Sequence, residues 1–418
     1  MPLANSSQSE SASALVTRLA AQAREALGAL ATSSEQQRND ALRAAAAALR
    51  ARSDAILDAN RKDMAAAEQK GLSGALLDRL KLDATSIEGM AKGVEDISAL
   101  PDPLHRTLAE WNRPNGLHIA RVSVPLGVVG LIYESRPNVT ADAGALCLKS
   151  GNAAILRGGS ESVHSSLAIA HCLHMGLKQA GLPEHAIQLV PTTDREVVGE
   201  MLGAIGRIDI IIPRGGKGLT QRVMEESRVP TILHLDGNCH SYVQERADIA
   251  QAARVIANAK MRRTGVCGAT ESLVLDRAVL RTALPTILDA LQTAGCKEFR
   301  GDAEAQAADK RVTVANETDW GTEYLDAILS IKTVADVSEA IAHINRYGSH
   351  HTDAIFTTDD AVAKRFLAEV DSAIVMHNSS TQFADGGEFG MGAEIGISTG
   401  RLHARGPVGA EQLTTYKY

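Results

Sequence analysis

The chain has 418 residues, of which 44% are hydrophobic and 22% charged, so it can bury enough apolar surface to fold and is neither disordered nor collagen-like. At about 150 residues per domain, this length predicts two or three domains. The net charge of −7, from 43 Lys and Arg against 50 Asp and Glu, argues against a nucleic-acid partner.

The longest apolar run, residues 124–133, is far shorter than the ~20 residues that cross a bilayer. Residues 1–16 lack the basic and apolar regions of a secretory signal, so we expect a cytoplasmic protein. The cysteines are odd in number and include no CxxC pair, which argues against a disulfide framework and a zinc site. We therefore expect reduced thiols and no metal at Cys147, Cys172, Cys239, Cys267 and Cys296.

The first hundred residues are predicted to be mostly helical. Leucines and alanines recur at helical spacing over residues 13–100, and residues 44–48 are all alanine, the best helix former. Residues 117–125 instead alternate between apolar and polar side chains, which predicts an extended hairpin or arm.

From residue 127 onward, short β-rich runs alternate with helical lengths, as in a parallel sheet covered on both faces. A second alternation begins near residue 248, so the sequence predicts two doubly wound α/β domains, and the last residues suit an edge strand. Strands are expected at 127–133, 153–158, 187–191, 208–213, 231–236, 272–276, 311–315, 327–331 and 354–356, and helices at 162–180, 277–294 and 334–347.

The dinucleotide fingerprint GxGxxG is absent, but PRGGKGL (213–219) follows a predicted strand and opens a helix. Gly215 and Gly216 would let a ligand approach the backbone, the helix N-terminus would offer N–H groups to an anion, and Lys217 adds a positive charge. The alternative is a glycine-rich turn with a solvated lysine.

Arg157 follows a predicted strand, and ligands bind at the carboxyl ends of strands in open α/β sheets. A guanidinium there suits the 2′-phosphate of NADP, although a solvated surface arginine is an equal alternative.

Cys267 lies in RRTGVCGATES, where the neighbouring Arg262 and Arg263 would favour the thiolate. It is a candidate nucleophile, and the alternative is a small buried apolar residue. Cys147, Cys172 and Cys296 are expected to be structural.

Asn138, in SRPN (135–138), begins a predicted helix after a strand. Its side chain could cap that helix, or its amide could donate to an oxyanion. Both interpretations stay open on local sequence.

Together these features resemble the aldehyde dehydrogenase superfamily and, within it, the glutamate-5-semialdehyde dehydrogenase family. The resemblance covers essentially the whole chain. Its most specific stretches are PLGVVGLIYESRPNVT (125–140), PRGGKGL, HLDGNCH (234–240), RRTGVCGATES (262–272), INRYGSHHTDAIFT (344–357) and the segment 378–418.

The resemblance implies roles for four residues: Cys267 as nucleophile, Asn138 as oxyanion donor, Arg157 at the cofactor-binding lysine position, and Glu323 in WGTEY as the ligand of the nicotinamide ribose. It implies an NADP-binding domain at 1–107 and 122–233 and a catalytic domain at 234–376. It also implies an oligomerisation arm at 108–121 and 400–418, a glycine-rich return segment at 377–399, and a homo-oligomer.

One departure from the superfamily bears on the reaction. Aldehyde-oxidising members carry a general-base glutamate in ELGGK, where this chain reads HLDGN with His234 in the glutamate's place. Such a base activates water, and that water would hydrolyse the thioester that a reductase must keep until hydride arrives. His234 could donate a proton or simply pack, and packing is favoured.

The implied reaction is NADPH-dependent reduction of L-glutamate 5-phosphate, through a thioester on Cys267, to the semialdehyde and phosphate in proline biosynthesis. Arg136, Arg263 and Arg401 are candidate substrate cations, and each could equally form a surface ion pair. A glutamate 5-kinase is a candidate partner. The alternatives are a hydrolytic aldehyde dehydrogenase acting on another semialdehyde and a catalytically silent scaffold.

Overall fold

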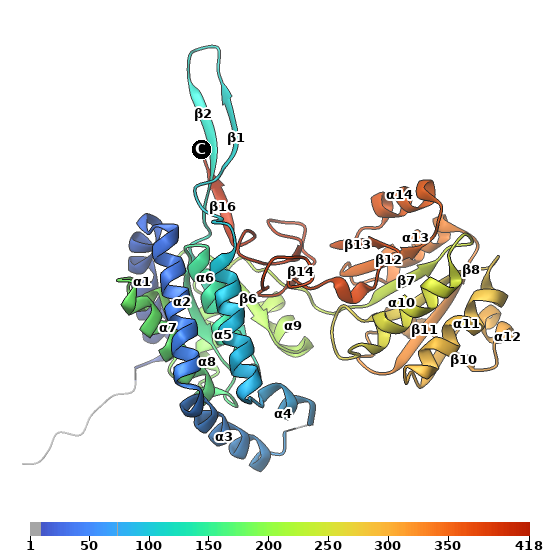
Figure 1. The fold of residues 1–418 in the computed structure, drawn as a ribbon, viewed down its shortest axis with the longest axis horizontal. Helices are drawn as coiled ribbons and strands as arrows, with labels where there is room; N and C mark the ends of the chain where they lie inside the picture. The colour runs from blue at the N-terminus through green and yellow to red at the C-terminus, as the bar shows by residue number, and fades with distance from the viewer. Residues whose placement is uncertain (1–9, 73) are drawn as a thin grey trace, which may run out of the picture. The chain divides into compact units, whose positions relative to one another are not determined.

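The computed structural model describes residues 10–72 and 74–418, which form two compact units (Figure 1). The first unit holds the chain up to Leu233 with Met391–Gly396 and Val408–Tyr418, and the second holds His234–Gly390 and Ile397–Pro407. Part of the N-terminal segment in which we find no secretory signal, residues 1–9, lies outside the described residues. Within the described ranges, no helix is both long and apolar enough to cross a membrane.

Five helices open the first unit, which confirms the helical prediction for residues 13–100. Side-chain oxygens of Ser11, Ser34 and Asp83 accept backbone N–H groups in the first turns of three of these helices and so set where they begin. The helices are α1 (Ala12–Thr32), α2 (Glu35–Ala51), α3 (Ser53–Gln69), α4 (Gly74–Leu80) and α5 (Ala84–Ala99).

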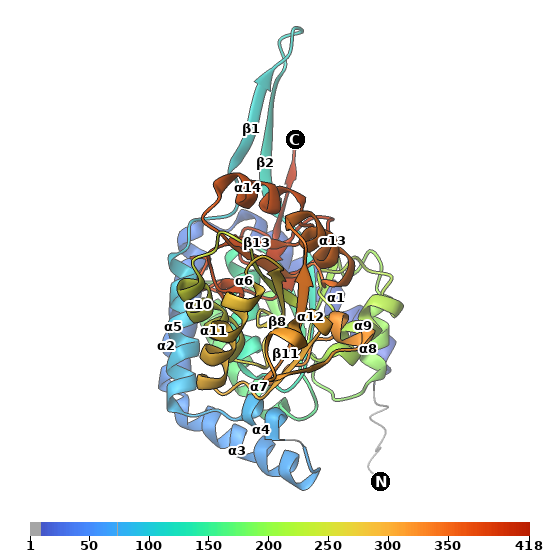
Figure 2. The ribbon, with the colours of Figure 1, turned by 90° about the vertical axis from the view of Figure 1, so that its right-hand side faces the viewer.

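A three-stranded antiparallel sheet contains β1 (Thr107–Asn112), β2 (His118–Pro125) and β16 (Thr414–Lys417), in the order β1-β2-β16. The predicted extended segment is therefore one strand of a hairpin, and the chain's last strand lies at a sheet edge, as predicted. The hairpin extends well beyond the helices of the first unit (Figures 1 and 2).

The core of the first unit is a parallel sheet of order β5-β4-β3-β6. All six residues of β3 are buried, which explains its continuous apolar sequence. The elements are β3 (Val128–Tyr133), α6 (Asn138–Lys149), β4 (Ala153–Arg157), α7 (Val163–Gln179), η1 (Glu184–Ala186), β5 (Ile187–Leu189), α8 (Glu196–Leu202), β6 (Ile210–Arg214) and α9 (Lys217–Glu226).

The strand predicted at 231–236 is wrong. Only Thr231 makes a bridge, to Ile211, and the next residues lead from the first unit into the second at Leu233 and His234. Since the run TILHLD spans this change of unit, only its start can pair with β6.

The second unit holds a seven-stranded parallel sheet of order β10-β9-β11-β8-β7-β12-β13. Its strands are β7 (Cys239–Val243), β8 (Thr270–Asp276), β9 (Glu298–Gly301), β10 (Val312–Val314), β11 (Ile328–Val334), β12 (Thr352–Phe356) and β13 (Ile374–His377). The other elements are α10 (Ile249–Met261), α11 (Leu280–Thr293), α12 (Ala303–Ala308), η2 (Glu317–Gly321), α13 (Val337–Tyr347), α14 (Asp360–Glu369), η3 (Thr381–Phe383), β14 (Ile397–Ser398) and β15 (Gly406–Pro407).

Strand β8 shows how this sheet is covered on both faces. Leu273 and Leu275 belong to a core cluster with Ile256 of α10 and Leu284 of α11. Val274 between them belongs to a second cluster, with side chains from α13 and α14. Because successive side chains of a strand point to opposite faces, the sheet needs helices on both sides, which confirms the doubly wound fold.

Strands β7, β9 and β13 were not predicted. The residues CHSYV of β7 are all buried, but they include His240 and Ser241, and the other two strands have only four residues each. Strand β7 buries polar side chains and charged residues alternate along β9, so neither has a continuous apolar run, and β13 is too short to stand out.

Candidate active site

Sheet order brings the catalytic candidates of the second unit together. Glu323 precedes β11, Cys267 precedes β8, His234 and Gly237 precede β7, and His351 precedes β12. These strands are neighbours and parallel, in the order β11-β8-β7-β12, so the segments before them share one edge of the sheet.

The Cys267 segment lies against the segment that leads into β7. A Cβ on Gly237 would lie only 2.0 Å from the carbonyl oxygen of Cys267, so this close approach requires glycine. The Gly237 N–H donates to Glu323 Oε1 at 2.9 Å, and the Cys239 thiol donates to the Cys267 carbonyl at 3.1 Å. These contacts hold both Cys267 and Glu323 against the residues that lead into β7.

Two imidazoles lie close to the Cys267 thiol. One ligand atom each of His234, Cys267 and His351 lies within 4.8 Å of the others. The two rings cross at 74°, with their centroids 5.1 Å apart. Burial by itself would raise the pKa of the Cys267 thiol, but the charge of His351 and hydrogen bonding to His234 and His351 outweigh it and hold that pKa well below its ordinary value.

The other four cysteines differ from Cys267 in both burial and thiol pKa. All are buried, whereas Cys267 is only partly so. Burial raises the pKa of Cys147 to about 12 and of Cys172 to about 11, and it raises the pKa values of Cys239 and Cys296 as well. Among the five thiols of the chain, only Cys267 has the low pKa of a reactive cysteine.

His234, for which packing was the favoured role, has its ring beside the thiol. His351 was quoted from the sequence without any role. The signal that could have found it is a histidine pair, HH at 350–351, directly before a strand of buried residues.

The same three side chains could hold a metal ion, although no metal site was predicted. Their N₂S donor set suits Zn²⁺, but ligand atoms around Zn²⁺ lie ~3.3–3.6 Å apart, given bond lengths of about 2.0–2.3 Å. The ligand atoms of the three side chains lie up to 4.8 Å apart, which is wider than that spacing, so metal binding would require the side chains to move closer together.

In the first unit, the candidates follow the carboxyl ends of three adjacent strands. Asn138 follows β3, Arg157 ends β4, and Gly215 follows β6, in the sheet order β4-β3-β6. This is the edge at which open α/β sheets bind ligands.

Asn138 is the first residue of α6 and not its cap, so the capping interpretation is wrong. Pro137 holds the cap position with no side-chain hydrogen bond. The Asn138 amide instead donates to Asp142 Oδ2, one helical turn on, at 3.0 Å. Burial raises the pKa of Asp142 to about 6, against the lowering effect of this bond.

Arg157 is buried, which excludes a solvated surface arginine. Its guanidinium donates to the carbonyl oxygens of Gly158 at 2.8 Å and Thr193 at 3.0 Å, while its buried Nε has no hydrogen-bond partner among the described residues. The side chain therefore anchors the loop after β5 and retains one unpaired donor.

The predicted anion site at PRGGKGL is partly filled by the protein itself. Gly216 is the N-cap of α9, and its N–H donates to Glu134 Oε2 at 3.0 Å. A Cβ on Gly215 would lie 2.5 Å from that oxygen. Lys217, the first residue of α9, has an interaction partner of its own.

The candidate substrate cations lie apart from one another along the chain. Arg401 is exposed and forms an ion pair with Asp371, the surface pairing that the sequence also allowed. Arg263 is exposed, and its carbonyl accepts from Gln382 Nε2 at 3.2 Å. Arg136 lies between β3 and α6 and is itself partnered.

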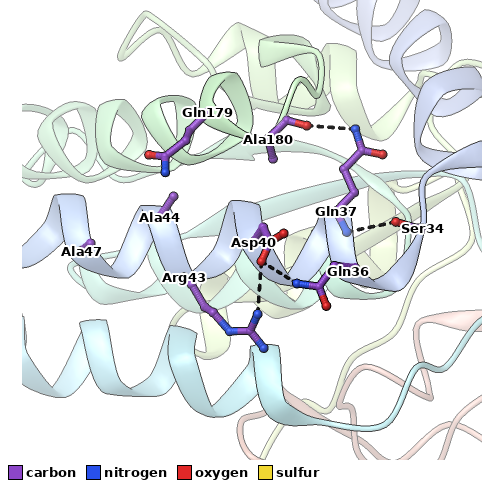
Figure 3. A pocket seen from close by; sticks show the side chains of 9 residues that line it. All are labelled: Ser34, Gln36, Gln37, Asp40, Arg43, Ala44, Ala47, Gln179 and Ala180. Carbon is purple, nitrogen blue, oxygen red and sulfur yellow. Dashed lines mark hydrogen bonds and ion pairs between the residues drawn. The ribbon is translucent and has the colours of Figure 1, made fainter.

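A shallow pocket in the first unit is distinct from these groups. It lies between α2 and the end of α7, and its polar side chains largely bond to their own neighbours (Figure 3). Gln37 Nε2 donates to the Ala180 carbonyl at 2.9 Å, and Arg43 pairs with Asp40. None of the predicted site residues lines it.

Comparisons with known proteins identify the family to which the chain belongs. The sequence profile of the Aldehyde dehydrogenase family matches residues 4–305. Gamma-glutamyl phosphate reductase of Rhodospirillum rubrum is 63% identical over 404 residues, 97% of this chain and 94% of the relative, and that of Paramagnetospirillum magneticum is 61% identical over 97% and 96%.

Solved structures extend the likeness to three dimensions. The crystal structure of gamma-glutamyl phosphate reductase from Thermotoga maritima has a TM-score of 0.93 and 43% identity, covering 96% of this chain and 97% of that one. An acetylating aldehyde dehydrogenase from Geobacillus thermoglucosidasius, at 17% identity and a TM-score of 0.68 over 97% and 96%, shares the fold. The chain belongs to the aldehyde dehydrogenase family and, within it, to the gamma-glutamyl phosphate reductases.

Proposed function

We propose that this chain reduces the acyl phosphate of L-glutamate 5-phosphate to L-glutamate 5-semialdehyde and phosphate, with NADPH as reductant, in the second step of proline biosynthesis. One observation carries the proposal: a single thiol with a strongly lowered pKa lies close to two imidazoles, in a chain closely similar to gamma-glutamyl phosphate reductases. A free carboxylate is a poor electrophile, and the acyl phosphate supplies the leaving group that a thiolate can displace.

Cys267 is the nucleophile. Its thiolate attacks the acyl carbonyl carbon, a C–S bond forms, the C–O bond to phosphate breaks, and a thioester remains on the enzyme. The imidazoles of His234 and His351 favour the thiolate at neutral pH. After reduction of the thioester carbonyl, the C–S bond breaks and the aldehyde leaves as the thiolate re-forms.

Asn138 is the donor to the oxyanion that develops during both steps, together with a backbone N–H near Cys267. Its support is the family resemblance and the hydrogen bond that holds its amide on Asp142. Preorganised donors of this kind typically contribute about 10²–10³ in turnover.

The cofactor proposal rests on residues at the carboxyl edge of the first unit's sheet. Arg157, with its buried unpaired Nε, fits a phosphate ligand. Gly216 has no neighbour among the described residues closer than 3.9 Å to its would-be Cβ, whereas the side chain of Glu134 would have to move before a ligand could approach Gly215. Lys217 adds charge there, and Glu323 of the second unit is the proposed ribose ligand. When bound, NADPH supplies the hydride that reduces the thioester carbonyl.

Arg136 and Arg263 are the proposed cations for the substrate's phosphate and carboxylate. Arg401 is a weaker candidate, because Asp371 already neutralises it.

A hydrolytic aldehyde dehydrogenase is disfavoured, because a histidine stands where that chemistry uses a glutamate base. A silent scaffold would not require a thiol with a strongly lowered pKa. Neither another semialdehyde as substrate nor a kinase partner has a specific observation in its favour.

The test runs the reaction backwards, following NADP reduction by glutamate 5-semialdehyde with and without phosphate. We expect a burst of one NADPH per chain without phosphate and continuous turnover with it. Cys267→Ala should lose both, and Cys172→Ala, which removes a buried thiol of the first unit, should keep both. Continuous turnover without phosphate would instead identify a hydrolytic enzyme.

We propose that the β1–β2 hairpin and β16 form an oligomerisation arm. Exposed large hydrophobic side chains lie on these strands, between β1 and β2, and directly after β16: Leu108, Trp111, Leu117, Tyr416 and Tyr418. The Trp111 and Tyr418 rings meet edge to face. Sedimentation of Trp111→Arg should show a smaller species than the unaltered chain. An unchanged sedimentation coefficient would contradict the assignment.

A further inference from the structure

His234 is held in one tautomer. Its Nδ1 lies 2.8 Å from the carbonyl oxygen of Ile397, and a carbonyl oxygen can only accept, so Nδ1 carries the hydrogen. The neutral His234 ring therefore gains a proton on Nε2, and the charged ring loses it from there. Since the ring contributes a nitrogen to the cluster with the thiol, Nε2 is the group placed to exchange a proton with Cys267.

His351 differs from His234 in burial. It is fully buried, and its Nδ1 lies 2.8 Å from Thr352 Oγ1 and 3.7 Å from Cys239 Sγ. His234 is only partly buried. A group that passes a proton to substrate must be accessible, and of the two rings His234 meets that requirement.

The chemistry of the acyl phosphate demands such a proton. When the C–O bond breaks, its electron pair goes to the phosphate oxygen, and an unprotonated phosphate would depart as a strongly basic trianion. Forming the Cys267 thiolate releases one proton in the same step. A base that stores this proton and then donates it to the leaving oxygen balances the reaction without an outside acid.

We propose that His234 takes the proton of the Cys267 thiol and delivers it to the phosphate oxygen that leaves as the thioester forms. The C–S bond forms, the C–O bond breaks, and the products are the thioester and monohydrogen phosphate, with no change in oxidation state. In the reverse direction, His234 removes the proton from the attacking phosphate. His351 is a positioning residue that packs against the His234 ring and favours the thiolate.

The inference rests on the proposed role of Cys267. The titratable groups around the His234–Cys267 pair are His351, Glu323, Asp236 and, against the Cys267 backbone, Cys239. Each can influence the ionisation of the thiol, so the experiment separates ionisation from proton delivery.

The test compares His234→Gln with the unaltered chain in aldehyde oxidation. The pH dependence of Cys267 alkylation first gives a pH at which the thiol is ionised in both proteins. At that pH, the acyl-enzyme is released by phosphate or by hydroxylamine, which attacks thioesters as the neutral amine. We expect the NADPH burst and hydroxylamine turnover to persist, and phosphate turnover to fall about 10²–10⁴-fold.

Two matched variants serve as controls. His185→Gln, at an exposed position in η1, should change neither rate. His351→Gln should move the alkylation profile to higher pH but leave the ratio of the phosphate to the hydroxylamine rate unchanged. Persistence of the hydroxylamine rate also shows that a variant is folded.

The outcomes are distinct. If His234→Gln lowers both rates equally, or leaves the phosphate rate intact, His234 does not deliver the proton and the inference is wrong. If the unaltered chain shows no burst, or Cys267→Ser retains it, the proposed function fails before His234 is tested.

Discussion

Replacing Gly237 by alanine tests whether close packing of two backbone segments positions the nucleophile. The added Cβ would lie 2.0 Å from the Cys267 carbonyl oxygen, 2.5 Å from its Cα and 2.6 Å from its carbonyl carbon. All three are backbone atoms, so no side-chain rotation relieves the overlap. Ordinary van der Waals contact begins at 3.4 Å, so the two segments must separate by about 1 Å or more.

A displacement of this size at the thiol should reduce kcat/KM for phosphate-dependent aldehyde oxidation about 10²-fold, because ~1 Å misplacements of reacting groups have costs of that order. Overpacking should also lower the free energy of unfolding by about 1–3 kcal/mol, measured in urea. The NADPH burst should become slow while its amplitude stays at one per chain.

Gly89→Ala is the matched control. Gly89 lies within α5 and has no atom within 4 Å of its would-be Cβ, so alanine should leave activity unchanged and stabilise the helix by about 0.5–1 kcal/mol. If Gly237→Ala keeps kcat/KM within threefold of the unaltered chain, the contact does not position Cys267 and the reasoning is refuted.

Three further predictions concern charged groups. The pKa of Asp142 is about 6 in the folded chain and ~3.9 in the unfolded chain, so the folded state binds more protons between these two pH values. The free energy of unfolding should therefore fall as the pH rises from about 4 to about 6. In urea titrations, Asp142→Asn should lose this pH dependence. Lys260 and Glu271 form a fully buried ion pair, so Lys260→Met should lower the free energy of unfolding by about 3–5 kcal/mol because it leaves a buried charge unpaired. The double variant Lys260→Met with Glu271→Leu should lose less stability than the single variant. Equal losses would show that the pairing is unimportant. Arg157→Lys should raise KM for NADPH about tenfold or more with little effect on KM for NADH, whereas an equal rise for both would mean that only the loop anchored through Thr193 is affected.

Local sequence was informative wherever a single segment carries the physical signal. The apolar run of β3, the helical spacing before residue 100 and the alternation at 117–125 each predicted the observed element. Prediction failed where a buried strand contains polar residues, or where an apolar run does not form a strand. Strand β7 buries His240 and Ser241, and the run at 231–236 lies where the chain passes from one unit to the other.

The candidate active site likewise combines residues that local sequence indicated with residues that it did not. Cys267 was a candidate because of its glycines and neighbouring arginines, yet the groups that lower its thiol pKa are His234 and His351, which lie 33 and 84 positions away along the chain. The interaction of Asn138 with Asp142, at helical i,i+4 spacing, was readable in principle from the predicted helix.

By itself, the sequence determined the α/β class, the candidate nucleophile and the family, because strand periodicity and motifs are properties of contiguous residues. Only the tertiary structure decided which histidines face the thiol. The order β11-β8-β7-β12 sets four segments, distant along the chain, at one sheet edge. Strand order follows from how helices pack on both faces of the whole sheet, and no local pattern encodes it.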